Sequence, residues 1–231
     1  MHVPDGFLDG PTSLATVGVA TVAVAAALRG ARRELDDRTA PLAGLVAVFV
    51  FAAQMVNFPV GAGTSGHLMG GVLAAVLVGP WTATLALTVV LVVQALAFAD
   101  GGLTAIGTNV TLIAVVAVWV GYGVFRLVQA VRPQSHRLIP FAAAIGALVS
   151  VPAAALVFTG LWAVGGAAPI DLGLLATTMI SWHSLIGIGE AVITFLAVSA
   201  VLSARPDIVH AARHLTSQPE LQVRTAAETS S

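Results

Sequence analysis

Seven apolar segments separated by short polar turns are the feature that most limits what this chain can fold into. They occupy residues 12–28, 42–58, 66–79, 81–98, 104–131, 138–162 and 172–203. A helix that crosses a bilayer needs roughly 20 mostly apolar residues, and hydrophobic residues make up 58% of this chain against 9% charged. No ten-residue alternation typical of a membrane β-barrel occurs. We therefore expect an all-α integral membrane protein with about seven transmembrane helices.

The third segment is short, and Gly79-Pro80 separates it from the fourth. The loop before it, residues 57–66, reads NFPVGAGTSG and is rich in glycine, proline and small polar residues. Irregular backbone at membrane depth is tolerated only where protein or a water-filled cavity covers it. The sequence thus predicts a loop that dips into the bundle, and a cavity open to the exterior with His67 at its base.

The ten arginines predict the orientation of the chain. They lie between segments one and two, at or beyond the end of segment five, and after segment seven. Seven crossings put all of them on one side, which the positive-inside rule makes cytoplasmic. We expect a multi-pass protein of the cell membrane, with its N-terminus outside and its C-terminus inside. The expected domains are a transmembrane substrate-binding domain, 1–203, and a polar cytoplasmic tail, 204–231.

Composition excludes several classes of function. A net charge of −1 gives no indication of nucleic-acid binding, and the absence of cysteine excludes disulfides and thiolate metal sites. The sequence also contains no lysine, so it cannot form a phosphate-binding loop of the Walker A type. ATP hydrolysis, if it drives this protein, must occur in another subunit. No positive charge precedes the first apolar segment, so we expect no cleavable signal peptide.

The first two residues offer an unusual set of metal donors. The amine of Met1, the backbone amide of His2 and Nδ1 of His2 can close two chelate rings around one ion in a single plane. A fourth nitrogen from His67 would complete a square, which suits Ni(II) or Cu(II). The alternatives are an ordinary polar terminus for His2 and, for His67, a helix-start histidine bonded to backbone. Pro4-Asp5-Gly6 fits a tight turn that tucks the terminus inward, with Asp5 bonded inside the turn or in contact with the cavity wall. The alternative for Asp5 is an ordinary exposed turn.

Polar residues inside apolar segments are further candidates for the site. His183 and Glu190 are seven residues apart and share one helix face. An intramembrane carboxylate indicates a functional site, so Glu190 could orient a ligand, accept a proton or pair with His183; a pair that only fixes helix packing is the alternative. Other candidates for the cavity lining or for interhelical hydrogen bonds are Gln54, Asn57, Ser65, Gln94, Asn109 and Thr111. His136, His210 and His214 lie near arginines and are expected to be solvated.

Four stretches together resemble one family. MHVPDGFLDG, NFPVGAGTSGHLMGG, FADGGLTAIGTN and HSLIGIGEAVIT are similar to the CbiM/NikM proteins, the substrate-binding membrane subunits of energy-coupling-factor (ECF) transporters for cobalt and nickel. The resemblance implies a seven-helix fold whose inserted N-terminus forms the site, with Met1, His2 and His67 as ligands. It also implies a transmembrane coupling subunit, cytoplasmic ATPases and often a small accessory membrane protein.

The expected function is therefore capture of Ni(II) or Co(II) as a transported substrate, with no chemistry catalysed by this chain. Two other hypotheses remain open at this point. One is an intramembrane metalloenzyme that uses histidines and Glu190, and the other is a passive divalent-metal channel. A catalytic metal keeps an open coordination position, whereas the terminal chelate and His67 fill a square plane.

Overall fold

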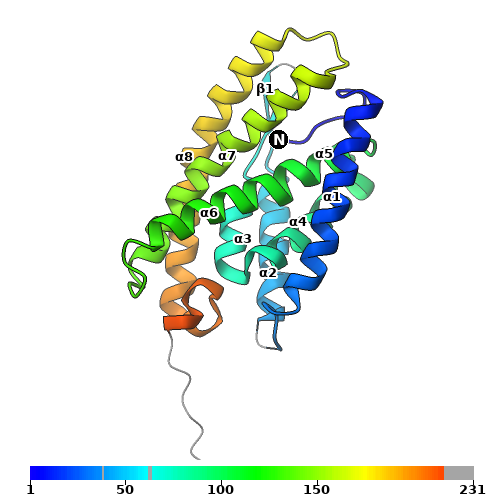
Figure 1. Cartoon of the computed structure of the whole chain (residues 1–231). Helices are drawn as coiled ribbons and strands as arrows, with labels where there is room; N and C mark the ends of the chain where they lie inside the picture. The colour runs from blue at the N-terminus through cyan, green and yellow to red at the C-terminus, as the bar shows by residue number, and fades with distance from the viewer. Residues whose placement is uncertain (38, 62–63, 216–231) are drawn as a thin grey trace, which may run out of the picture.

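The computed structural model describes residues 1–37, 39–61 and 64–215, and it is a bundle of helices (Figure 1). The α-helices are α1 (Gly10–Ala31), α2 (Ala40–Gln54), α3 (Gly71–Val78), α4 (Pro80–Phe98), α5 (Ile106–Asn109), α6 (Val118–Gln129), α7 (Leu138–Gly165) and α8 (Leu172–Ala204). A π-helical stretch, η1 (Val110–Ala117), joins α5 to α6, so that residues 106–129 form one rod. Two 3₁₀ turns, η2 (Pro206–Ile208) and η3 (His210–Leu215), follow α8.

Helix forms in every one of the seven apolar segments, which confirms an all-α membrane protein. Among the described residues, five helices are long and apolar enough to cross a membrane, namely α1, α4, the rod 106–129, α7 and α8. The apolar helix α2 is shorter. Helix α3 has only 8 residues, because Gly79, with φ of 97°, ends it before Pro80 begins α4. The number of crossings and the side on which each terminus lies stay predictions.

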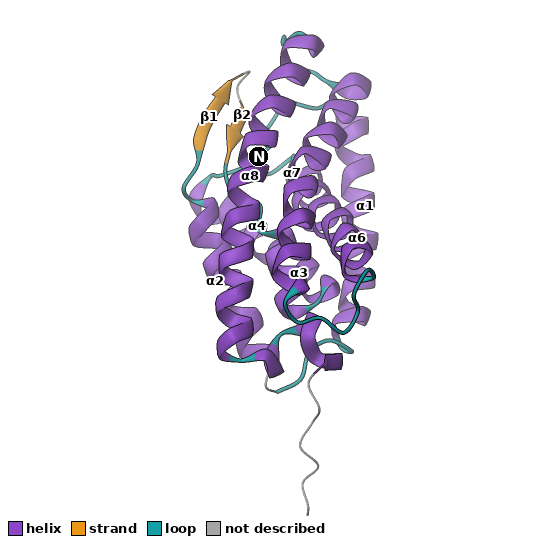
Figure 2. Ribbon diagram, turned by 90° about the vertical axis from the view of Figure 1, so that its left-hand side faces the viewer, coloured by secondary structure: helices purple, strands orange, loops and turns teal. Residues whose placement is uncertain are grey.

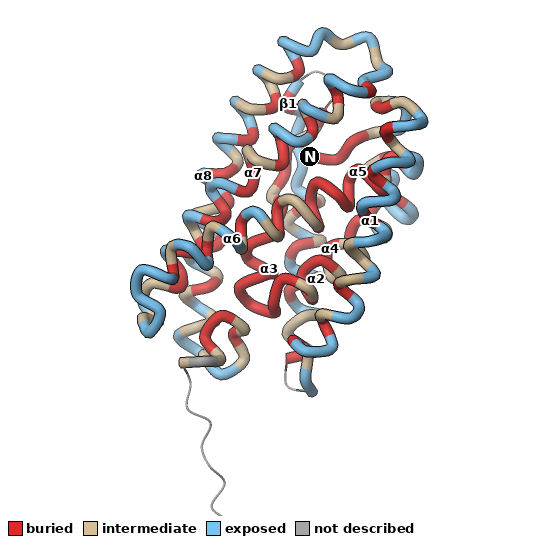
Figure 3. The backbone as a smooth tube through the Cα atoms, in the orientation of Figure 1, coloured by how far each residue is buried: buried red, intermediate tan, exposed pale blue. Residues whose placement is uncertain are grey.

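The core of the bundle surrounds α3, whose residues are all buried. Figure 3 shows buried backbone running through α3 and through the extended N-terminal segment. Large apolar side chains instead cover the outer faces of the long helices; Leu14 is 72% exposed on α1 and Leu196 is 59% exposed on α8. Apolar surface of this extent is unfavourable in water and is what lipid tails would cover.

A small hairpin departs from the all-helical pattern. Strands β1 (Phe58–Gly61) and β2 (Thr64–Gly66) pair antiparallel, with Phe58 opposite Gly66. Figure 2 shows the hairpin toward one end of the bundle, and Figure 1 shows the C-terminal part of α8, in orange, at the other. The loop that was predicted to be irregular thus contains a hairpin, in which the backbone of β1 is hydrogen-bonded to that of β2. We call these two ends the hairpin end and the arginine-rich end.

Glu34 caps the N-terminus of α4, which lies at the arginine-rich end of the bundle. Its buried carboxylate accepts hydrogen bonds from the backbone amides of Trp81 and Thr82, at 3.2 and 2.7 Å, and from the Thr82 hydroxyl at 2.9 Å. A carboxylate at a helix N-terminus satisfies free amides and complements the helix dipole. The stretch 206–215 then folds onto this end and buries Val209 and Ala212 fully. Residues 216–231 of the predicted tail lie outside the described residues.

Candidate metal-binding site

The N-terminal segment enters the bundle and is held there by backbone pairing. Met1 and Val3 are each 1% exposed and His2 is 5% exposed. The side chain of Asn109 pairs with Val3 as a second strand would, accepting from its amide at 2.7 Å and donating to its carbonyl at 3.1 Å. The amide of Gly102 also donates to the Val3 carbonyl at 2.9 Å. Residues 1–3 therefore occupy a defined place in the interior.

The turn after Val3 fastens this segment to the loop between α4 and α5. The exposed Asp5 carboxylate accepts from the amide and the hydroxyl of Thr104, at 2.7 and 2.5 Å, and these bonds lower the pKa of Asp5. Gly101 has φ of 93°, and a Cβ on Gly102 would collide with the Asp5 backbone. Only glycine permits so close an approach. Asp5 thus lies in an exposed turn and bonds the loop between α4 and α5, not the wall of a cavity.

His67 lies at the inner end of the N-terminal segment. It is 1% exposed, and its Nδ1 donates to the carbonyl of Leu68 at 2.8 Å. This bond places the ring proton on Nδ1 and leaves the lone pair of Nε2 available. Nε2 contacts the amine nitrogen of Met1. The backbone-bonded alternative for His67 and its candidacy as a ligand are therefore compatible, since each uses a different nitrogen.

The His2 imidazole lies between His67 and Asp100. Its ring stacks on that of His67 with centroids 4.4 Å apart and planes inclined by 26°. Its Nδ1 lies 3.1 Å from Oδ1 of Asp100, whose other oxygen accepts from Asn57 at 3.3 Å. Burial lowers the pKa of His2, while Asp100 acts to raise it. Both histidines near the amine thus have imidazole nitrogens suited to a metal ion.

Glu190 reaches the site from α8 by bonding the chain just after His67. Its carboxylate oxygens accept from the amides of Met69 and Gly70, at 2.7 and 2.9 Å. The Met69 carbonyl in turn accepts from Gln54 of α2 at 2.9 Å. Glu190 therefore binds the backbone just before α3 and fixes the segment that carries His67. Its oxygens are engaged with backbone, so the predicted pairing with His183 is not how this carboxylate is held.

His183 is fully buried on α8, at the level of the segment 64–70. One turn earlier, Met179 accepts from Thr64 at 3.3 Å, and two turns later Glu190 bonds Met69 and Gly70. Nδ1 of His183 donates to the Met179 carbonyl at 2.8 Å, and its buried Nε2 has no hydrogen-bond partner among the described residues. His183 lies near enough to the Met1 amine for the two groups to interact electrostatically. Ser65, another residue predicted to line the cavity, lies in β2 and is paired with Pro59 of β1 in the hairpin.

A cavity of about 440 Å³ reaches His67 and Glu190. Its other lining residues are mostly apolar and come from α2, β1 and α8, with Phe58 and Trp182 among them. The sequence predicted a cavity open to the exterior above His67. The structure instead places this cavity beside the hairpin, on the flank formed by α2 and α8, while the N-terminal segment fills the space next to the histidine.

Side chains alone do not form a metal site in the described part of the chain. Across residues 1–37, 39–61 and 64–215, no group of three or more His, Cys, Asp or Glu side chains could hold a metal ion by itself. Burial lowers the pKa of the Met1 amine to about 4, and Asp100 and Glu190 offset this only in part. The amine is therefore neutral at pH 7 and presents a lone pair. A neutral amine can ligate an ion without first losing a proton.

Two contributors to the site were not predicted from the sequence. They are Asp100, which faces His2, and the pair Gly101 and Gly102, all of which lie within the similar stretch FADGGLTAIGTN. The signal available was an acidic residue followed by two glycines directly after an apolar segment. Such a pattern indicates a tight turn, but it does not identify which segment the turn contacts.

Known proteins are similar to this chain over most of its length. The family model described as cobalt uptake substrate-specific transmembrane region matches residues 2–208. A putative metal transport protein of Haloquadratum walsbyi is 40% identical over 210 residues, covering 90% of this chain and 93% of the relative. A putative fused nickel transport protein of Archaeoglobus fulgidus is 40% identical, covering 90% of this chain and 68% of the relative. The crystal structure of a truncated transition metal transporter superposes with a TM-score of 0.81 at 32% identity, covering 88% of this chain and 99% of that one.

Proposed function

Because this chain belongs to the CbiM family of cobalt-uptake substrate-specific transmembrane proteins, we propose that it is the subunit that captures Ni(II) or Co(II) for an ATP-driven importer of the ECF type. It is a multi-pass membrane protein, and its relatives carry the names of cobalt, nickel and other metal transport proteins. In the proposed role the ion is the transported substrate. The chain itself catalyses no reaction.

The proposed donors are four nitrogens: the Met1 amine, the His2 amide after loss of its proton, Nδ1 of His2 and Nε2 of His67. The observation that carries this proposal is the contact between the buried amine and Nε2 of His67. Without an ion, the neutral amine can donate an N–H to the lone pair of Nε2, so this contact is a hydrogen bond that brings two potential donors together. An ion that accepts both lone pairs would replace this hydrogen bond, and four nitrogens in a plane suit Ni(II) on geometry.

Binding would change the partner of His2. Its Nδ1 faces Asp100 at 3.1 Å, so the imidazole has to exchange the carboxylate for the ion in order to complete the chelate. A divalent ion with one deprotonated amide carries a net charge of about +1. Asp100 would then lie close enough to balance that charge, which a site of low dielectric requires. Glu190 would act through the backbone, by keeping His67 in position.

The proposed partners are a transmembrane coupling subunit, cytoplasmic ATPase subunits and a small accessory membrane protein. The support within this chain is chemical, because a sequence without lysine cannot form the phosphate-binding loop of such an ATPase. In this proposal a partner hydrolyses ATP and drives the site to open toward the cytoplasm. The N-terminus would face the exterior, as the arginine distribution predicts.

The decisive experiment adds one alanine before Met1 and measures Ni(II) and Co(II) binding to the purified protein by titration calorimetry. The peptide bond would abolish the amine and push the new terminus away from His67, so we expect affinity to fall by more than about 100-fold, equivalent to about 2.7 kcal/mol. The matched control adds one alanine after Ser231 and should bind as the original chain does. Equal affinities in the two extended proteins would refute the chelate.

A histidine pair tests the fourth ligand. His67→Ala removes the Nε2 donor and should weaken binding strongly. His136→Ala removes a histidine at the arginine-rich end, beside α7, and should not. The bound Ni(II) should be diamagnetic and yellow if the plane is square. A paramagnetic six-coordinate spectrum would contradict the proposed donor set.

A further inference from the structure

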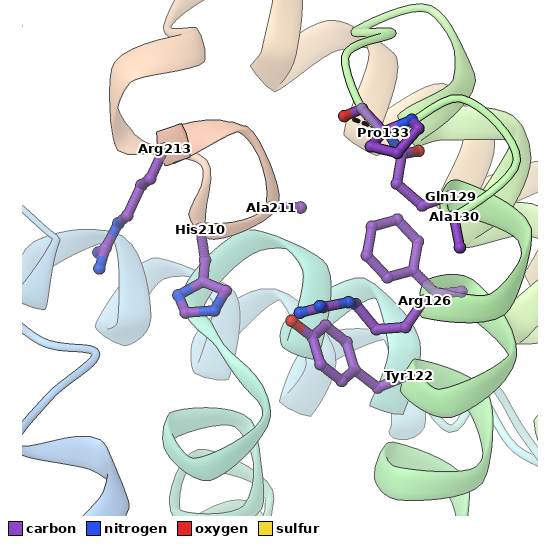
Figure 4. A pocket seen from close by; sticks show the side chains of 9 residues that line it. Tyr122, Arg126, Gln129, Ala130, Pro133, His210, Ala211 and Arg213 are labelled. Carbon is purple, nitrogen blue, oxygen red and sulfur yellow. Dashed lines mark hydrogen bonds between the residues drawn. The ribbon is translucent and has the colours of Figure 1, made fainter. Parts of the chain in front are cut away.

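A second cavity, of about 520 Å³, lies at the arginine-rich end, between the last turns of α6 and the turn η3 (Figure 4). Its polar lining consists of Tyr122, Arg126, Gln129, His210 and Arg213. The candidate metal site uses none of these residues. A volume in this range accommodates a small ligand or a headgroup.

Two segments far apart in the sequence, residues 122–133 and 210–213, line this cavity. Fully buried Val209 and Ala212 anchor the stretch 206–215 against the bundle. Arg213 donates from Nη1 to the Glu34 carbonyl at 2.7 Å, which ties η3 to the loop that follows α1. In Figure 4 the side chains of Tyr122 and Arg126 point from α6 toward the side of the cavity where His210 lies. The sequence predicted a solvated His210, whereas the structure half-buries it.

The electrostatics of the cavity favour an anion. Two arginines line it, and no acidic residue is among the described residues that do so. The pKa of His210 is lowered to about 4, mainly by burial and further by the positive charges of Arg213 and Arg126. Burial is the larger cause of this shift, so the positive potential of the cavity comes from the two guanidinium groups that line it. Such potential concentrates anions, and guanidinium groups bind phosphate oxygens in pairs.

The cavity also offers a hydrogen-bond acceptor. Gln129 is 6% exposed. Its Nε2 donates to the carbonyl of Ser135 at 3.2 Å, while its buried Oε1 has no hydrogen-bond partner among the described residues. A buried acceptor without a donor costs about 1–3 kcal/mol. Gln129 lines the cavity, so rotation of its amide would let the hydroxyl group of a ligand donate to Oε1 while the anionic group of that ligand faces Arg126.

The surroundings place the cavity at a membrane boundary. Leu127, the residue after Arg126 on α6, is 74% exposed, and Val131, just beyond the end of α6, is 77% exposed. Apolar side chains this exposed are suited to contact with acyl chains. Basic pockets between transmembrane helices on the cytoplasmic side are suited to phospholipid headgroups. We propose that this cavity binds a phosphate group that carries a neighbouring hydroxyl, as in the glycerol phosphate headgroup of an anionic lipid or in a soluble sugar or glycerol phosphate.

The test uses the purified full chain in an uncharged detergent, with four probes: short-chain phosphatidylglycerol, short-chain phosphatidylcholine, glycerol 3-phosphate and inorganic phosphate. Tryptophan fluorescence follows thermal unfolding, because a ligand that binds the native state raises the midpoint. We expect phosphatidylglycerol to raise it and phosphatidylcholine not to. A rise with glycerol 3-phosphate of the same size would assign the site to soluble phosphates, and a rise with the lipid alone would assign it to the membrane.

Arg126→Gln should weaken binding of the anionic probe at least tenfold, and Tyr122→Phe less. The matched control is Arg29→Gln, since Arg29 is exposed at the same end on α1 and does not line the cavity. Arg126 is itself exposed, so both variants should fold, and equal midpoints without probe would verify this. The proposal fails if no phosphate probe binds, if phosphatidylcholine binds as well as phosphatidylglycerol, or if Arg126→Gln binds as the original chain does.

Discussion

Asn109 and Val3, 106 residues apart in the sequence, share two hydrogen bonds: the Val3 amide donates to Oδ1 of Asn109, and Nδ2 of Asn109 donates to the Val3 carbonyl. An asparagine side chain carries a donor and an acceptor at the spacing of a peptide group. It can therefore replace a neighbouring strand for one residue. Because Met1 and His2 precede Val3 directly, this pairing also fixes where the amine lies.

Asn109→Leu should release the N-terminal segment. The substitution keeps the volume similar but leaves the buried Val3 amide without a partner, at a cost of about 1–3 kcal/mol. We expect metal affinity to fall about 10–100-fold, as for other residues that position ligands. The amine of Met1 is the single primary amine in a sequence without lysine. An amine-reactive reagent followed by mass spectrometry therefore reports its exposure specifically, and labelling should be faster in the variant.

Asn57→Ala is the control for that experiment. Asn57 is exposed and donates one long bond, of 3.3 Å, to Asp100. Its loss should change labelling and affinity little. If Asn109→Leu also leaves the amine protected, then packing alone, without the Val3 pairing, holds the terminus in place.

Glu190→Gln should weaken metal binding although Glu190 donates nothing to the ion. The carboxylate accepts from two amides just before α3, and a glutamine amide offers only one acceptor atom, so one of these bonds is lost. His67 should then be held less firmly, and we expect affinity to fall about 10–100-fold. Glu34→Gln is the matched control, because the buried Glu34 carboxylate also accepts from two backbone amides, at the start of α4 and at the opposite end of the bundle. It should lower the unfolding temperature and leave metal affinity unchanged. If both variants lost affinity equally, Glu190 would affect metal binding only by stabilising the fold as a whole.

His183→Asn tests whether His183 touches the ion. Asparagine can keep the donor that bonds the Met179 carbonyl while it removes Nε2. Four nitrogens already fill the proposed plane, so we expect affinity to change less than tenfold and the Ni(II) absorption spectrum to stay the same. A shifted spectrum with weakened binding would instead identify Nε2 of His183 as an additional axial ligand.

Proton release should show which groups the ion deprotonates. Burial lowers the pKa of the Met1 amine to about 4, below its value near 8 in an unfolded chain. The docked amine therefore binds fewer protons than the undocked one between these values, and docking weakens as the pH falls from 8 to 4. At pH 7 the amine has no proton to lose, so binding should release about one proton per ion, from the His2 amide.

Calorimetry in two buffers with different ionisation enthalpies measures that number. Release of no proton would exclude the amide as a ligand. Release of two or more would show that the amine or an imidazole carries a proton at pH 7 in the folded protein.

Local chemistry could be predicted from the sequence, and relationships between distant segments could not. The donors of Met1 and His2 follow from two adjacent residues, and the shortness of α3 follows from Gly79-Pro80. His67 was identified because an unusual loop precedes it. The hairpin was missed, since small residues such as those of 57–66 have weak strand preference.

The supporting contacts were harder to predict because they depend on packing. Nothing near Glu190 in sequence indicates that its partners are amides 120 and 121 residues away. The same holds for Asp100, whose contact with His2 exists only because two glycines let one loop approach the N-terminal segment closely. An isolated intramembrane carboxylate predicted that Glu190 matters, but it did not predict that backbone would be its partner.

The contacts of residues 1–3 have a consequence for the order of assembly during synthesis. Their partners, His67, Asp100, Gly102 and Asn109, all appear later in the chain, and Glu190, which steadies His67, appears in the last long helix. Domains usually form from the N-terminus onward as the ribosome proceeds. Here the first residues to leave the ribosome lack their full set of partners until Asn109 has been made, and His67 is not held by Glu190 until α8 follows. A docked Met1 therefore indicates that helices made after it have already packed together.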